Sequence, residues 1–306
     1  GDEVTSAVAN PPSFPASIGH LNGWPVLADP TARKRGAVED EFVAPNVIYS
    51  RLRALGAQVV QYNHPRDTLS GLTSLGFFTN IGYDPDAPLG QAPNDILLDR
   101  DVLGPGRSGI MNPDGYRNLD FDTIEVANGV NLATTLAVRR DWLSLLNQTD
   151  FTTVPFIAGT AVSDSHRLTV ETPGYSRTYV SGVGDDPALL DVSLFDTRVR
   201  AGAMVGTNGP IVSAHLEDGD MAAGPGEKLR TPSGAVTLAV TVDAAPWIPV
   251  DEVRVIANGF VVRTFDAGSS PVVRRGPHNP YSRSPRGVRR FAARIALTVS
   301  QDTYVI

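Results

Sequence analysis

The sequence predicts a mixed α/β protein in two parts, with a parallel β/α barrel or open sheet over residues 1–206 and an antiparallel β-sandwich over residues 207–306. Two observations support this prediction. In the first part, short buried runs alternate with helical patterns and polar residues follow the runs, which is typical of parallel β/α folds. In the second part, the helical patterns stop and short strands follow one another, which is typical of a sandwich.

The first part holds its expected elements in a regular order. Residues 1–5 read as a strand already in progress. Apolar positions at helical spacing predict a helix over residues 43–55, which Gly56 ends, and a buried strand follows over residues 57–62. Further strands are expected over residues 121–126 and 156–162, and further helices over residues 136–146 and 192–201.

A long segment over residues 67–118 is rich in Gly, Pro and Asp and only weakly periodic. A connection of this length inside a compact domain is usually functional. We therefore expect it to run over an active-site face, where it could form a lid.

After Thr207-Asn208-Gly209-Pro210 the pattern changes to strands alone, which are expected over residues 211–216, 235–242, 252–257, 260–265 and 291–299. Asn258-Gly259 lies between two of these strands and is the strongest short signal for a hairpin. The last part is therefore predicted to contain no substantial helix. The chain stops inside an apolar run at Tyr304-Val305-Ile306, so we expect it to be part of a longer protein.

The composition of the chain excludes several classes of partner and of metal site. The 306 residues carry a formal net charge of -7, which argues against a nucleic-acid partner held by a general electrostatic field. The chain has no cysteine, so any metal ion must be held by oxygen and imidazole. No apolar run approaches the roughly 18 residues of a membrane span, and no leader pattern opens the sequence. An appended sandwich without cysteine leans towards a periplasmic or secreted location.

Three of the five histidines lie in strings typical of metal ligands: Gly19-His20-Leu21-Asn22, Asn63-His64-Pro65-Arg66 and Ser163-Asp164-Ser165-His166-Arg167. Each string is expected where a strand gives way to a turn, and the carboxyl ends of barrel strands meet at one face. Asp164 and His166 are two residues apart, so both should point to the same side of the strand end. The alternative is ordinary loop histidines and a polar strand end. Oxygen and imidazole ligands suit zinc, manganese or iron, which activate water for hydrolysis.

Two arginines follow these ligands closely. Arg66 and Arg167 could each hold an anionic substrate oxygen or neutralise charge in the transition state. The alternative role is a salt bridge to a ligating carboxylate. The Gly104–Gly109 spacing of a dinucleotide fingerprint is set aside because no helix can open after it.

These strings, in order along nearly the whole chain, resemble the PHP family, named for polymerase and histidinol phosphatase, and most of all its carbaryl-hydrolase-like metallohydrolases. The resemblance also covers Gly1-Asp2-Glu3-Val4-Thr5, residues 121–129, Gly174-Tyr175-Ser176-Arg177-Thr178-Tyr179-Val180, Thr207-Asn208-Gly209-Pro210 and Ala245-Pro246-Trp247. It implies a distorted (β/α)7 barrel with up to three divalent ions at the strand ends.

Carried over by motif, the resemblance assigns five metal ligands. Glu3 would bridge two ions, and His20 and His64 would complete the shell of the second ion. Asp164 would serve the first ion and His166 the third. The family's opening His-x-His motif has no counterpart before Glu3, so the barrel is expected to be incomplete. An upstream polypeptide segment would supply the missing ligands; the alternative is a degraded relative.

The expected function is a metal-dependent hydrolase in which a metal-activated water cleaves a phosphoester, or a carboxylic or carbamic ester, of a small-molecule substrate. Arg66 and Arg167 lean towards phosphate, whereas the resemblance leans towards esters or carbamates. The alternative is a non-catalytic binding or surface protein that keeps a degenerate barrel as a scaffold. The metal content of the protein would discriminate between the two.

Overall fold

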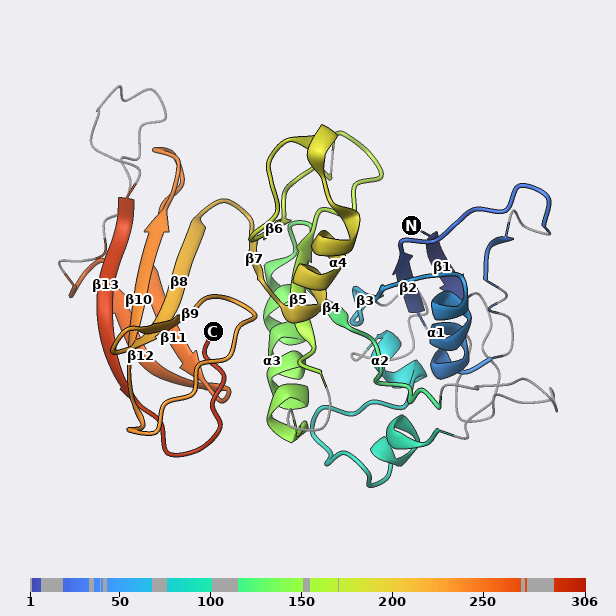
Figure 1. The fold of residues 1–306 in the computed structure, drawn as a ribbon, viewed down its shortest axis with the longest axis horizontal. Helices are drawn as coiled ribbons and strands as arrows, with labels where there is room; N and C mark the ends of the chain where they lie inside the picture. The colour runs from blue at the N-terminus through green and yellow to red at the C-terminus, as the bar shows by residue number, and fades with distance from the viewer. Residues whose placement is uncertain are drawn as a thin grey trace.

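The computed structural model describes residues 2–6, 19–32, 36–38, 40, 43–67, 76–100, 115–150, 155–169, 171–270, 273 and 289–306, with the backbone alone for residues 2–6, 79 and 80. The protein is a mixed α/β structure (Figure 1). The strands of the first part form a five-stranded sheet in chain order, namely β1 (Asp2–Ser6), β2 (Gly19–Trp24), β3 (Val59–Asn63), β4 (Thr123–Asn128) and β5 (Ala158–Val162).

The expectation of an all-parallel sheet was wrong for one of these strands, β2, which runs against the other four. β3, β4 and β5 are parallel, but β2 pairs antiparallel with both β1 and β3. The backbone N–H of Gln58 donates to the carbonyl oxygen of Trp24, so β3 begins where β2 ends. Burial patterns do not record strand direction, which explains the error.

The helices of the first part are α1 (Pro45–Ala54), α2 (Phe77–Asn80), α3 (Leu132–Gln148) and α4 (Val192–Ala201), with 3-10 turns over Asn94–Leu98 and Pro187–Leu189. Two of them begin at side-chain caps. The carboxylate of Asp191 accepts from the backbone N–H of Leu194, and the amide oxygen of Asn131 accepts from that of Thr134. α4 ends at Gly202, whose φ of 75° is left-handed.

The sheet has one apolar face and one polar face. The apolar face packs with α1 into the first hydrophobic core, to which it contributes Leu21, Val60, Tyr62 and Ile124. The opposite face carries Asn22, Gln61, Asn63, Thr123, Glu125 and Thr160, which we call the polar face. All of these polar residues except Asn22 are buried. A buried sheet face made of polar side chains is unusual, because each of its groups needs a hydrogen-bond partner.

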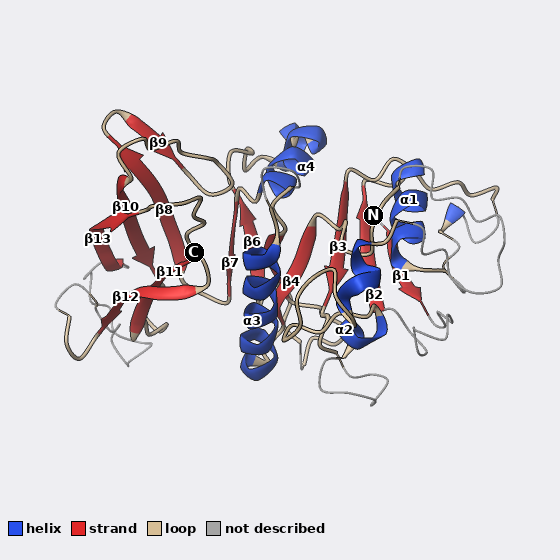
Figure 2. Cartoon of the chain, turned by 90° about the horizontal axis from the view of Figure 1, so that it is seen from below, coloured by secondary structure: helices blue, strands red, loops and turns tan. Residues whose placement is uncertain are grey.

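Two short strands, β6 (Arg177–Val180) and β7 (Met204–Thr207), form an antiparallel pair that the sequence pattern missed. The Thr178 hydroxyl joins this pair to β5, because it accepts from the backbone N–H of Ala161 and donates to its carbonyl oxygen. Figure 2 shows the pair between the five-stranded sheet and the C-terminal sheets.

The C-terminal part consists of two antiparallel sheets. One has the order β13 (Arg289–Thr298), β10 (Ala235–Asp243), β8 (Ile211–Asp218) and β9 (Met221–Ala223), and the other pairs β11 (Glu252–Ala257) with β12 (Phe260–Asp266). Their apolar side chains share a second core. The Asn258-Gly259 hairpin is confirmed, since both residues have the positive φ that a tight turn requires. Within the described ranges, no helix combines the length and apolarity needed to cross a membrane.

Candidate functional site

Two of the predicted ligands meet at one edge of the five-stranded sheet. His20 pairs with Asn63 in the antiparallel register of β2 and β3, so the start of β2 lies beside the end of β3. The rings of His20 and His64 are edge to face, with centroids 4.7 Å apart. His20 was expected at the end of a strand and instead lies at the start of one. The two imidazoles still come together because the strands run in opposite directions.

His64 has an unusual backbone. It follows the last residue of β3 with a φ of 24°, which residues other than glycine rarely adopt. Its backbone N–H donates to Oε2 of Glu125 at 2.8 Å. Glu125 belongs to the neighbouring strand β4 and is 4% exposed. A buried carboxylate on the adjacent strand therefore holds His64 in its strained conformation.

Phe77 covers the two imidazoles. Its ring centroid lies 5.5 Å from that of His20 and 5.9 Å from that of His64. Gly19 makes room for this ring, since a Cβ atom there would lie 2.9 Å from Cγ of Phe77. Phe77 comes from the long segment between β3 and β4. That segment therefore contacts the site at this residue.

The polar face forms a continuous hydrogen-bond network behind the imidazoles. The Gln61 amide donates to Oε1 of Glu125 at 3.2 Å and to Oδ1 of Asn63 at 3.1 Å. Asn63 in turn donates to Oδ1 of Asn22 at 2.9 Å. The hydroxyls of Thr123 and Thr160 both donate to Oε1 of Gln61. Sequence reasoning missed this network, although two polar residues alternating inside the buried run 57–63 were a usable signal.

Asp164 joins the network through Asn128. The Asn128 amide donates to Oε2 of Glu125 at 3.1 Å and to Oδ2 of Asp164 at 3.2 Å. Asp164 also has a positive φ, 47°. β5 ends at Val162, so the strand alternation expected for Asp164 and His166 does not extend to them. They are nevertheless in contact, because Nδ1 of His166 lies 2.9 Å from the carbonyl oxygen and 3.7 Å from Oδ1 of Asp164.

The two arginines differ in their surroundings. Arg66 forms a bidentate pair with Asp141 of α3, with Nε to Oδ2 at 2.5 Å and the second nitrogen to Oδ1 at 2.9 Å. The hydrogen bond from Arg66 to Asp141 raises the pKa of the guanidinium further above its ordinary value. Arg167 is exposed, and its guanidinium lies 3.5 Å from Glu171. Neither partner is one of the predicted ligating carboxylates.

Glu3 can be placed by its backbone alone, which pairs with that of Asn22, two residues from His20. Its side chain lies outside the described residues, as does the segment of residues 104–109. Among the side chains that the structure describes, no group of three or more His, Cys, Asp or Glu could hold a metal ion. The described part of the site therefore offers a pair of imidazoles and leaves a third ligand to be supplied.

Comparison with known proteins gives no relative to reason from. No family model, curated protein or solved structure matches the chain. The resemblance to PHP metallohydrolases therefore stays a prediction from motifs. The geometry of the site is the remaining basis for a function.

Proposed function

We propose that the protein is a divalent-metal-dependent hydrolase that cleaves a phosphoester, or a carboxylic or carbamic ester, of a small molecule. The observation that carries the proposal is the contact of His20 with His64, whose ring centroids are 4.7 Å apart at one sheet edge. Imidazoles brought together from separate strands, beside a buried carboxylate network, are typical of a zinc, manganese or iron site.

The residues fit such an ion in part. His20 and His64 would hold it, and Glu3 would be the third ligand because its backbone pairs with Asn22 on the neighbouring strand. Asp164 and His166 would contribute to further ions, up to three in the complete protein, with an upstream segment supplying the remaining ligands. When bound, such ions act as Lewis acids that activate water and polarise the scissile group.

Three side chains around the imidazoles, those of Phe77, Arg167 and Arg66, have further roles in this proposal. The Phe77 ring packs against both imidazoles, and its apolar surface would limit the access of water to them. Arg167 is the arginine that solvent reaches, with 70% of its side chain exposed, so we assign it the contact with an anionic substrate oxygen. Arg66 is held by the buried Asp141 and would fix the loop that follows His64.

Metal analysis combined with substitution tests the proposal. Purified protein loaded with Zn²⁺ or Mn²⁺ should retain metal in stoichiometric amount and hydrolyse p-nitrophenyl phosphate or p-nitrophenyl acetate. The His64→Ala variant should lose at least about 100-fold in metal affinity, the upper end of what loss of a ligand's partner causes. His215→Ala, on β8 of the C-terminal sheets, is the matched control and should keep both properties. Full activity in the His64→Ala protein would refute the assignment.

The alternative function is a non-catalytic scaffold or surface protein. The observation that favours it is the lack of a group of three ligands among the described side chains. This alternative predicts that added Zn²⁺ or Mn²⁺ neither binds nor raises the thermal stability of the protein. A metal bound to the folded state alone would instead raise that stability.

A further inference from the structure

We infer that Glu125 and Asn128 of β4 act together as positioning residues that fix the strand ends carrying His64 and Asp164 relative to each other. We call this pair the β4 clamp. That the clamp serves metal binding rests on the proposed function, whereas its hydrogen bonds are present whatever the function is. Neither residue is one of the predicted ligands.

The carboxylate of Glu125 is the centre of the clamp. Its Oε2 accepts from the backbone N–H of His64 at 2.8 Å and from the Asn128 amide at 3.1 Å. Its Oε1 accepts from Gln61 at 3.2 Å. A buried carboxylate is stable only when several donors satisfy it, so these contacts define one orientation of the side chain.

The clamp acts where the backbone is strained. Only three described residues other than glycine have a positive φ: His64, Asp164 and Asn258 of the distant hairpin. Such conformations persist where the surroundings hold them. Glu125 holds His64 through its backbone N–H, and Asn128 holds Asp164 through Oδ2 of its carboxylate at 3.2 Å.

The position of β4 explains why residues of this one strand can contact the ends of both β3 and β5. β4 lies between β3 and β5 in the parallel part of the sheet, so its carboxyl end is next to both of theirs. Ligands from different strands must keep a fixed separation to share a cluster of ions. β4 supplies that separation with a carboxylate and an amide, because its own end carries none of the predicted ligands.

The clamp can be tested first without metal. We would record the imidazole NMR signals of the metal-free protein and compare Glu125→Ala with Glu125→Gln. Loss of the acceptor in Glu125→Ala should shift the ring signals of His64 and His20 and leave those of His215 unchanged. Glu125→Gln keeps an acceptor for the His64 N–H and should restore the original signals, and it also serves if the alanine variant does not fold.

Thr160→Val is the matched control. Thr160 belongs to the same buried network, where its hydroxyl donates to Gln61 and to the Ile124 carbonyl oxygen. The structure gives it no hydrogen bond to His64, Asn128 or Asp164. Its loss should lower stability without moving the His64 signals. If Thr160→Val moved them as far as Glu125→Ala, or if Glu125→Ala left them in place, the clamp would be overturned.

A second measurement uses Zn²⁺ alone as the probe. Calorimetric titration should give an affinity about 10- to 100-fold weaker in Glu125→Ala and Asn128→Ala than in the original protein, as expected for partners behind the ligands. Glu125→Gln should recover most of the loss. Equal affinities in all variants would contradict the positioning role. If the original protein binds no Zn²⁺, the proposed function fails, and the metal-free spectra still decide whether the clamp exists.

Discussion

Gly19 is constrained twice, by conformation and by space. Its φ is 102°, and a Cβ atom there would lie 2.9 Å from Cγ of Phe77. Gly19→Ala should therefore lower the free energy of unfolding by about 1–2 kcal/mol for the left-handed backbone and a further 1–3 kcal/mol, roughly, for the contact with the ring. Urea unfolding measures the sum of these two losses. Gly174→Ala is the control, because its φ is 78° and a Cβ atom would meet nothing within 4 Å. Equal losses in the two variants would show that Phe77 can move aside freely.

A buried carboxylate on α4 gives a pH-dependent prediction. Asp196 is 2% exposed, and neither carboxylate oxygen has a hydrogen-bond partner of ordinary geometry. Burial raises the pKa of Asp196, and the side chain of Trp24 offsets this only in part. A raised folded-state pKa means that the folded protein binds the proton more tightly than the unfolded chain. The group therefore destabilises the fold at pH values above its folded pKa, and the penalty disappears below its unfolded value.

Asp196→Asn should remove this penalty. We expect the free energy of unfolding at about pH 7 to rise by about 1–3 kcal/mol, the cost of a buried group whose hydrogen bonding is incomplete. The gain should shrink as the pH falls towards the ordinary range of an aspartate. Denaturant curves of both proteins at several pH values would check this. A gain that is constant with pH would mean that the charge of Asp196 is not its source.

Some residues of the candidate site could be predicted from the sequence and others could not. His20, His64 and Asp164 carry chemistry that a motif displays, and each lies at a strand end of the sheet or beside one. Glu125 and Gln61 sit inside buried runs, where a polar residue has no pattern of its own. Their partners lie on other strands, so only the sheet register shows that they belong to the site.

Elements with strong local signals were predicted well. Residues 192–201 form the expected helix because Asp191 caps its start and Gly202 ends it. The strand expected over residues 252–257 matches β11, and the helix expected over residues 136–146 extends to Leu132–Gln148. Four strands were missed. β6, β7 and β9 have only three or four residues, too few to show periodicity, whereas the six residues of β2 were read as a ligand string at a strand end.

The pair of Arg66 with Asp141 links the end of β3 to α3 and gives a prediction at this scale. Asp141 is fully buried, and Arg66 is 10% exposed. Asp141→Ala would leave the guanidinium buried without its partner, so we expect stability to fall by about 3–5 kcal/mol. Arg66→Met combined with Asp141→Leu should recover much of the loss, because removing both charges avoids the desolvation penalty. Thermal unfolding of the single and double variants measures this. A double variant no more stable than Asp141→Ala would argue against it.

At the scale of the whole molecule, the chain builds two hydrophobic cores, one for the α/β part and one for the C-terminal sheets. Tyr304 connects them. Its hydroxyl donates to Oδ1 of Asn147 on α3 at 2.7 Å, and its ring packs against Phe156 at 6.1 Å. Burial raises the pKa of Tyr304 to about 12. The sequence could not show this contact, because no local pattern relates the last residues to a helix more than a hundred positions earlier.

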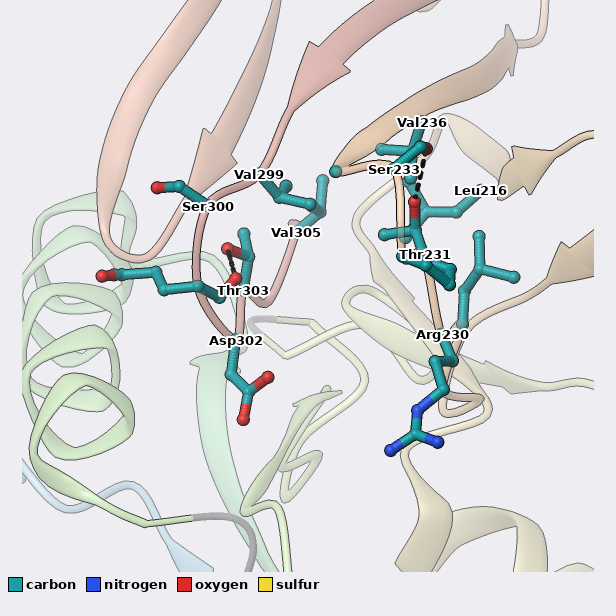
Figure 3. Close-up of a pocket in the computed structure, with 14 residues that line it drawn as sticks. Leu216, Arg230, Thr231, Ser233, Val236, Val299, Ser300, Asp302, Thr303 and Val305 are labelled. Carbon is teal, nitrogen blue, oxygen red and sulfur yellow. Dashed lines mark hydrogen bonds between the residues drawn. The ribbon is translucent and has the colours of Figure 1, made fainter.

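Two pockets lie near this C-terminal segment. One, of about 500 Å³, lies between residues 299–305 and residues 229–236, with Arg230 and Asp302 at its walls (Figure 3). A second of about 510 Å³ uses much of the same segment and adds Asn258 and Arg263. The residues around His20 and His64 line neither of them. The segment thus borders both pockets, and its end pairs with β11 through hydrogen bonds between Ile306 and Ile256.

The hairpin at Asn258-Gly259 gives the last prediction, because it packs against α3 together with Tyr304. Gly259 has a φ of 81°, and a Cβ atom there would lie 2.6 Å from the Asn147 amide. Gly219→Ala is the control, since its φ is 60° and a Cβ atom would meet nothing within 4 Å. Both variants should lose about 1–2 kcal/mol from the left-handed backbone.

Gly259→Ala should lose more, because the new methyl group pushes Asn147 away from Tyr304 and costs a hydrogen bond of about 1 kcal/mol. If that contact couples the two cores, we expect the original protein and Gly219→Ala to unfold in a single calorimetric transition and Gly259→Ala to show a broadened or split one. Splitting in both variants, or in neither, would mean that the cores are coupled elsewhere. The comparison therefore separates the cost of a strained turn from the cost of breaking the joint between the two parts of the molecule.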